Sequence, residues 1–159
     1  MNKTALRDAI VAQLRAELAL QTTAALLARD EAISEESRAE NKYDTHSQEA
    51  AYLAEGQARQ AAEIEASLAH YAALPLPAFS PGDAIALGAV VELGAGRRRT
   101  CYFVGPRAGG MELVVDGSEI LVVTPQSPLG RQLLGRRVGD SVSLPGRPAA
   151  TVAPITRVA

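Results

Sequence analysis

The residues of this chain that are best placed to do chemistry are three acids in a polar stretch, at Glu36, Glu40 and Asp44. Residues four apart lie on the same face of a helix, so Glu40 and Asp44 share a face if a helix continues through them. Acidic side chains that share a face are candidates for a functional role. The alternative interpretation is a solvated helix end, because exposed ends are commonly acidic for solubility and to balance the helix dipole.

Other reactive residue types are scarce. The single cysteine, Cys101, excludes an internal disulfide and most cysteine metal sites, and its place among apolar residues indicates a packed thiol. The two histidines, His46 and His70, are far apart in the sequence, so a metal site is not expected. The chain has no apolar run of about 18 residues, and its start does not resemble a secretory signal. We therefore expect a cytoplasmic protein that contacts no membrane and has no cofactor of its own.

The elements that must position these acids are helices. All nine prolines lie at or beyond Pro75, and Gly56 is the one glycine before that point. Since Pro and Gly disfavour helix interiors, residues 1–74 are predicted to be helical. A single helix of that length would exceed about 100 Å, so we expect an antiparallel coiled-coil hairpin with an acidic tip near residues 35–44. Two capping boxes, at 37–40 and 45–48, are candidates for the start of the second helix. The predicted seam consists of Val11, Leu14, Leu18, Ala25 and Ala28 on the first arm and Ala61, Ile64, Leu68 and Tyr71 on the second.

The second half has a different sequence pattern. Residues 75–82 are predicted to be a linker, and residues 83–159 a β-rich domain, because short apolar runs there are bounded by Gly, Pro or Asp. A short helix is expected after Ser127, with Pro128 at its first position and Gly135 as its stop. The runs predicted to be strands are 84–87, 89–93, 100–104, 111–115, 120–123, 141–144 and 150–153. The fold class is therefore α+β. Residues 1–74 carry seven basic and twelve acidic side chains, a net −5, and the remainder carries nine and six, a net +3.

Two segments of this second half resemble the Gre-type bacterial transcription elongation factors, the GreA/GreB-like family. Residues 102–106, Tyr-Phe-Val-Gly-Pro, are similar to the family's Y-x-x-V-G-P. Residues 127–142, Ser-Pro-Leu-Gly-Arg-Gln-Leu-Leu-Gly-Arg-Arg-Val-Gly-Asp-Ser-Val, are similar to its S-P-[IL]-x-R-x-L-[IL]-G-[KR]-x-x-G-D-x-V. The second match is long and specific. Along the hairpin the likeness is looser, through architecture and residues 64–68.

This resemblance implies a coiled-coil hairpin joined to an FKBP-like domain that docks on RNA polymerase. It implies a monomer whose hairpin enters the polymerase secondary channel and promotes cleavage of backtracked RNA, so that nascent RNA is met at its 3′ end only indirectly. The chain would then be no enzyme itself. Acids of the tip, here Glu36, Glu40 and Asp44, would help the polymerase to hold a second Mg²⁺, and two metals stabilise both oxygens of an in-line displacement. The matching motif makes Ser127, Pro128, Arg131, Arg136 and Arg137 the candidate polymerase-binding residues.

The tip departs from the family's usual G-D-L-x-E-N-A-E-Y. A gap-free alignment places Glu40 on the family's Asp but Tyr43 on its Glu. Three hypotheses stay open: acids that support cleavage, a tip that enters the channel and regulates or inhibits without cleavage, and a plain solvated tip. Two further hypotheses come from other classes. An FKBP-like prolyl isomerase or chaperone would need an aromatic pocket, and the chain has no Trp and two Phe. A coiled-coil adaptor would need a seam that continues into a partner.

Overall fold

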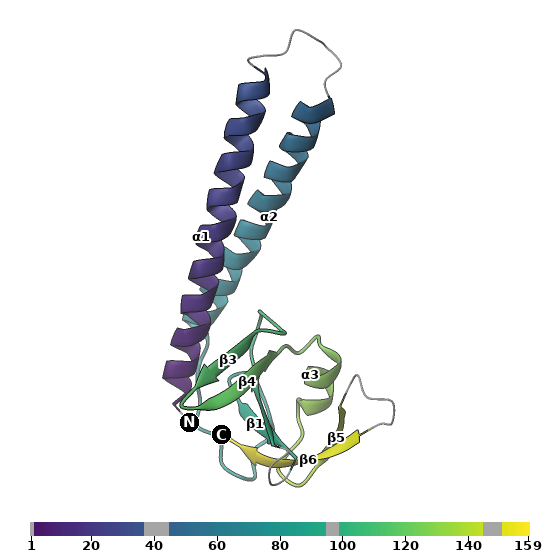
Figure 1. Ribbon diagram of the computed structural model, residues 1–159. Helices are drawn as coiled ribbons and strands as arrows, with labels where there is room; N and C mark the ends of the chain where they lie inside the picture. Colours follow the sequence, from purple (N-terminus) through teal and green to yellow (C-terminus); the bar gives the residue numbers. More distant parts are fainter. Residues whose placement is uncertain (1, 37–44, 95–98, 145–150) are drawn as a thin grey trace. The chain divides into compact units, whose positions relative to one another are not determined.

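The computed structural model describes residues 2–36, 45–94, 99–144 and 151–159 (Figure 1). The chain divides into two compact units. One unit is the helical segment 11–69, and the other combines residues 1–10 with residues 70–159. Both boundaries fall inside helices. The α+β class predicted from the sequence is confirmed, since long amino-terminal helices are followed by a mixed sheet.

Two long helices form the hairpin, α1 over Lys3–Glu36 and α2 over Thr45–Ala73. The side chain of Asn2 caps α1, because its Oδ1 accepts hydrogen bonds from the N–H groups of Thr4 (3.0 Å) and Ala5 (3.2 Å). The second helix ends at Ala73, just before Pro75. At 1.5 Å per residue the two helices are about 50 and 45 Å long. No helix in the described part of the chain has the apolar length that a membrane crossing requires.

The predicted seam is confirmed at its buried positions. Leu14, Ala28 and Ile64 are buried within the helical segment 11–69, whereas Val11, Leu18, Ala25, Ala61 and Leu68 are half-buried. Small alanines let two helices approach closely, but they bury little apolar area. The first capping box and most of the predicted tip, residues 37–44, lie outside the described residues.

The other unit contains a six-stranded mixed sheet with the order β3-β4-β2-β1-β6-β5. Its strands are β1 (Val90–Leu93), β2 (Thr100–Val104), β3 (Glu112–Val115), β4 (Ser118–Val123), β5 (Ser141–Leu144) and β6 (Thr151–Val158). β2 and β4 are parallel, and the other neighbours are antiparallel. Asp116 and Gly117 both have positive φ, 52° and 72°, which is the two-residue turn that joins β3 to β4.

One predicted strand is wrong. Residues 84–87 form no strand, although Ile85 is buried and its backbone pairs with the loop after α3 (Pro128–Leu133). The chain turns at Gly88, whose φ is +81°, and a Cβ there would lie 2.7 Å from the Pro75 carbonyl oxygen. This close approach to residue 75 requires glycine and ends the run before it can join the sheet. The apolar run therefore reflected one buried side chain and not a period-two strand.

The carboxy-terminal end of α2, from residue 70, packs within the unit that contains the sheet. Tyr71 is fully buried, and its hydroxyl donates a 2.7 Å hydrogen bond to the Arg107 carbonyl oxygen. A Cβ on Gly105 would lie 2.3 Å from that hydroxyl, so glycine makes the contact possible. Lys3, at the start of α1, bonds to the Pro77 carbonyl oxygen and lies 4.5 Å from the centre of the Phe79 ring. Residues 75–79 are thus contacted by Gly88 at Pro75 and by Lys3 at Pro77 and Phe79. The predicted domain boundaries 1–74, 75–82 and 83–159 stay predictions.

Candidate functional site

The candidate site begins at the start of α3, where an N-cap and a proline define the first turn. Ser127 is its N-cap: the hydroxyl accepts a hydrogen bond from the Gly130 N–H (3.0 Å) and donates one to the Thr124 carbonyl oxygen (2.8 Å). Pro128 follows at the first helical position, where its fixed φ suits a helix and no N–H is needed. Two of the five predicted binding residues therefore form a rigid corner, as the sequence pattern led us to expect.

Gly130 makes this corner tight. A Cβ on Gly130 would lie 1.9 Å from the Thr124 carbonyl oxygen and 2.9 Å from the Ser127 hydroxyl. Backbone atoms cannot yield by that much, so any side chain here would push α3 away from the end of β4. The position is variable in the family pattern, and the close approach of the Thr124 carbonyl oxygen explains the glycine.

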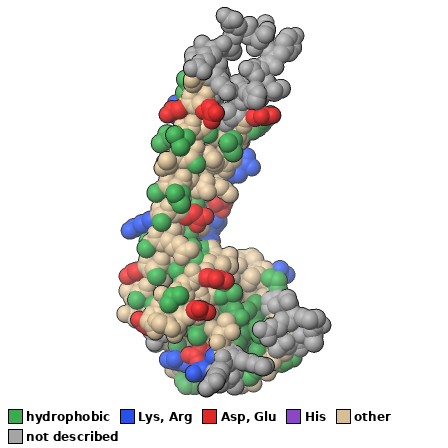
Figure 2. All heavy atoms as spheres, in the orientation of Figure 1, with side chains coloured by type: hydrophobic (Ala, Val, Ile, Leu, Met, Phe, Trp, Pro, Cys, Tyr) green, Lys and Arg blue, Asp and Glu red, His purple; other side chains and the backbone are tan. Residues whose placement is uncertain are grey.

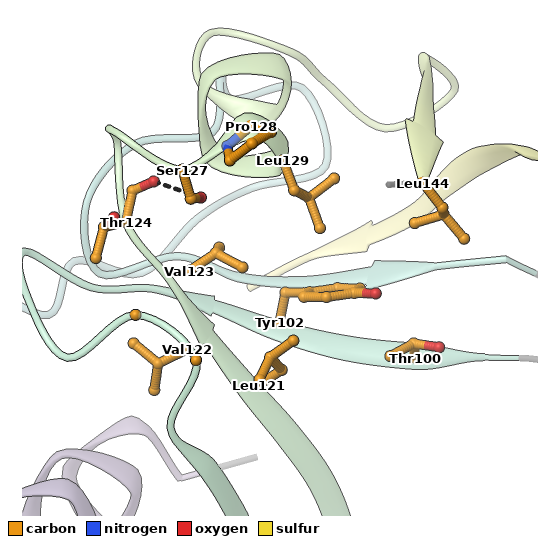
Figure 3. A pocket seen from close by; sticks show the side chains of 12 residues that line it. Thr100, Tyr102, Leu121, Val122, Val123, Thr124, Ser127, Pro128, Leu129 and Leu144 are labelled. Carbon is orange, nitrogen blue, oxygen red and sulfur yellow. Dashed lines mark hydrogen bonds between the residues drawn. The ribbon is translucent and has the colours of Figure 1, made fainter. Parts of the chain in front are cut away.

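A groove of about 590 Å³ opens beside this corner (Figure 3). Its walls come from β2, β4, α3 and β5, and its lining is mostly apolar. Leu129 and Tyr102 belong to the buried core, whereas Leu144 and Leu121 pack at the edge of that core. The full lining is Thr100, Tyr102, Gly109, Gly110, Leu121, Val122, Val123, Thr124, Ser127, Pro128, Leu129 and Leu144. A concave apolar surface with hydroxyl groups at its rim is suited to hold an apolar segment of another molecule.

The three predicted arginines do not converge on this groove, since none of them lines it. The Arg131 guanidinium bonds to the Gln126 carbonyl oxygen through Nε (3.0 Å) and Nη2 (2.8 Å). The Arg137 side chain bonds to the Gly82 carbonyl oxygen, and its backbone N–H bonds to Asp140 Oδ2 (2.9 Å). Arg136 is exposed and makes no side-chain hydrogen bond or ion pair with the described residues. Arg136 is therefore the arginine of the three most available to a partner.

The acids predicted at the tip are not placed by the structure. Glu36 is the last residue of α1, and Glu40 and Asp44 lie outside the described residues. Within the described ranges, no group of three or more His, Cys, Asp or Glu side chains could hold a metal ion. Whether the acids share a face stays a prediction.

The hairpin carries a feature that the sequence reading missed. Several large apolar side chains of the helical segment are exposed, including Leu20 and Tyr52 at 73% and Leu27 at 66%. Hydrophobic side chains reach the surface along the helices among acidic and basic ones (Figure 2). A second groove, of about 530 Å³, runs between the helices and is lined by Thr22, Ala25, Leu26, Arg29, Ala54, Glu55, Ala58, Ala61, Ala62 and Glu65. Alanines line much of this groove, and the larger side chains Leu20, Leu27 and Tyr52 are exposed to solvent.

Cys101 shows no sign of reactivity. It is half-buried on β2, and burial together with the nearby Glu92 carboxylate raises the pKa of its thiol, against the weaker pull of Arg99 and Arg157. A raised pKa lowers the thiolate fraction at neutral pH, and the thiolate is the nucleophile. The expectation of a packed thiol agrees with this environment.

Comparison with known proteins adds one decisive finding. Residues 80–157 match the family described as transcription elongation factor, GreA/GreB, C-term. Residues 80–157 belong to the GreA/GreB family. The match covers the β-rich part up to residue 157, with the α3 corner and the groove, but it does not extend to the hairpin. It confirms the resemblance carried by residues 102–106 and 127–142, and it makes the protein a GreA/GreB-like transcription elongation factor.

Solved structures of the same kind are similar over nearly the full length. The crystal structure of GreA factor homolog 1 (Gfh1) of Thermus thermophilus is 22% identical, with 94% of each chain covered and a TM-score of 0.38. A structure of the transcription factor Gfh1 is 23% identical, covers 94% of this chain and 93% of its own, and has a TM-score of 0.39. For Thermus aquaticus Gfh1 the values are 22%, 92% of each chain and 0.38. No curated protein sequence matches significantly. The family assignment rests on residues 80–157.

Proposed function

We propose that this GreA/GreB-like factor binds RNA polymerase through the groove beside α3 and carries its hairpin tip into the secondary channel. There the tip would promote cleavage of backtracked RNA by the polymerase itself, with no active site in the factor. The observation that carries the docking part is the coincidence of two features. The family-specific residues Ser127 and Pro128 stand at the rim of the apolar groove between α3 and the sheet.

The groove supplies the chemistry of docking. An apolar segment that enters it would remove Leu121, Leu144 and the exposed face of Pro128 from water, and burial of apolar surface contributes about 25 cal/mol per Å². The Ser127 hydroxyl is already committed to α3, so it orients Pro128 and need not contact the partner itself. Arg136 would add an electrostatic contact at the periphery, which favours fast association more than affinity.

The hairpin supplies reach. From residue 11 to residue 36, α1 extends for about 40 Å, so the helical segment is long enough to carry an acid at its end into a narrow channel. Mg²⁺ prefers oxygen ligands and keeps several waters, so a carboxylate from one protein can complete a site built by another. In this proposal Glu40, Asp44 or Glu36 provides that carboxylate, and the metal belongs to the polymerase. Such a factor would work in the cytoplasm, where the polymerase is.

One observation favours a second candidate function. The sequence around Glu40 and Asp44 departs from the family's usual acid spacing, which fits a factor that enters the channel and slows or retunes the polymerase without cleavage. Docking would be the same in both cases. The two functions differ only in what the tip does.

A transcript-cleavage assay on a backtracked bacterial elongation complex tests the tip. Wild type is compared with a Glu40→Ala/Asp44→Ala double variant, and Glu49→Ala, an exposed acid on α2, is the matched control. Cleavage that the double variant loses and the control keeps supports the acid role. Slower elongation with no cleavage supports the second function and refutes the first.

Docking is tested separately. Pro128→Glu places a charge at the groove rim, and an acid in the first turn is well tolerated by the helix dipole, so the fold should persist. Val152→Glu is the control, because Val152 is 62% exposed on β6 and does not line the groove. We expect at least tenfold weaker polymerase binding for Pro128→Glu alone, equivalent to roughly 1.4 kcal/mol. Equal binding by both variants would refute the groove as the docking site.

A further inference from the structure

Gln132 makes an unusual set of contacts for a helix side chain. Its Oε1 accepts a hydrogen bond from the Ser143 N–H (2.9 Å), and its Nε2 donates one to the Ser143 carbonyl oxygen (3.1 Å). The same Nε2 lies 3.4 Å from the Pro128 carbonyl oxygen, one turn earlier in α3. One side-chain amide thus joins the first turn of α3 to the middle of β5.

The contact replaces a missing strand. β5 is the last strand of the sheet and pairs with β6 on one side only. In an antiparallel pair, alternate residues direct both backbone groups away from the neighbour, and the bonds from Ser143 to Gln132 show that Ser143 is one of these. The Gln132 amide offers Ser143 the same donor and acceptor that a neighbouring strand would offer. It therefore closes an edge that would otherwise pair with another chain.

The contact also lies beside the groove. Leu144, next to Ser143, forms one wall, and Pro128 and Leu129 form the facing wall (Figure 3). β5 and α3 are 11 residues apart at the Gln132–Ser143 contact, and the hydrogen bonds hold them at a set distance. Without these bonds β5 keeps its pairing with β6 and the packing of Val142 and Leu144, but no hydrogen bond from the Gln132 side chain fixes its distance from α3.

We propose that Gln132 is a positioning residue that holds β5 against α3 and thereby sets the width of the polymerase-docking groove. This inference rests on the proposed docking function and deepens it. The residue occupies an open position of the family pattern, between the matched Arg131 and Leu133. Binding of a partner in the groove at its observed width would therefore depend on Gln132, a residue that the family motif does not specify.

Two variants separate positioning from mere stability. Gln132→Met keeps the side-chain length and removes the amide, so it deletes both bonds to Ser143 with little loss of packing. Gln126→Met is the matched control: Gln126 is exposed beside the same helix, and only its backbone carbonyl is used, by Arg131. Hydrogen exchange of the Ser143 amide reports whether the Gln132–Ser143 bonds hold β5 in the free protein. Polymerase affinity reports whether the loss of these bonds changes docking.

We expect faster exchange at Ser143 in Gln132→Met, together with roughly tenfold weaker polymerase binding, while exchange in the central strands β1 and β2 stays slow. Gln126→Met should match wild type in both measurements. Faster exchange at Ser143 with unchanged polymerase affinity would overturn the positioning role. Unchanged exchange would overturn it as well, because it would show that the Gln132 amide bonds do not hold β5 in place. Failure of wild type to bind polymerase would instead refute the docking proposal, and the Gln132 inference with it.

Discussion

Removal of the Ser127 hydroxyl tests whether the α3 corner is built as described. In Ser127→Ala the Gly130 N–H loses its acceptor, because it belongs to the first turn and has no intrahelical partner. Loss of an N-cap costs about 0.5–2 kcal/mol. The Thr124 carbonyl oxygen is affected less, since it also accepts a hydrogen bond from the Ser127 backbone N–H (3.0 Å) and keeps that partner. We therefore expect a loss of about 1.5 kcal/mol in the free energy of unfolding.

This magnitude also determines how a binding defect is interpreted. A domain stable by about 5 kcal/mol or more remains over roughly 99% folded after a loss of 1.5 kcal/mol. Weaker polymerase binding by Ser127→Ala would then reflect a displaced Pro128 and not unfolded protein.

The assay is urea unfolding at 25 °C, followed by the NMR amide signals of β2 and β4, which report the sheet and not the hairpin. Ser127→Thr keeps the hydroxyl and should lie within about 0.5 kcal/mol of wild type. A loss of less than about 0.3 kcal/mol for Ser127→Ala would refute the capping argument, since the cap would then contribute nothing measurable.

Three further predictions follow from buried and exposed side chains. Tyr71→Phe should cost about 1–2 kcal/mol, because the buried hydroxyl bonds to the Arg107 carbonyl oxygen. Burial also raises the pKa of the Tyr71 hydroxyl above its ordinary value of 10.0. The unfolded state therefore releases this proton at a lower pH than the folded state, and the free energy of unfolding falls as pH rises above 10. When urea midpoints at pH 8 and pH 11 are compared, this fall should be smaller in Tyr71→Phe than in wild type. Gln57→Met should stabilise the hairpin by about 1 kcal/mol in thermal melts followed by circular dichroism at 222 nm, because Gln57 Oε1 is buried without a partner among the described residues. Leu27→Glu should change stability by less than about 0.5 kcal/mol in the same melts, whereas Leu14→Ala should cost about 2–5 kcal/mol, since Leu27 is exposed and Leu14 is buried.

Each of these has a control or a contrary result. An equal alkaline loss in wild type and Tyr71→Phe would assign the effect to another group, such as Cys101, whose pKa is raised in the same direction. Gln60→Met, at an exposed position one turn along α2, should leave the melt unchanged. A large destabilisation by Leu27→Glu would show that this face of α1 is covered in solution.

The sequence by itself determined the elements and the family. Helix-breaking residues concentrate beyond Pro75, so the extent of the helices followed from backbone chemistry that acts locally. The α3 corner was equally readable, because a Ser N-cap, a Pro at the first position and a Gly stop each act within one turn. Motif residues 127–142 then indicated the family, which the match over residues 80–157 confirmed.

Only the tertiary structure decided what these elements form together. The groove needs β2, β4, α3 and β5 side by side, and no local rule brings Tyr102, Leu129 and Leu144 to one surface. The same holds for Gln132 and Ser143, whose pairing depends on β5 being an edge strand. Residues 84–87 show the reverse failure: an apolar run suggested a strand, but the close packing of Gly88 on Pro75 turned the chain first. Local propensity is set by a few neighbouring residues, whereas a groove is set by distant segments whose packing fixes their separation.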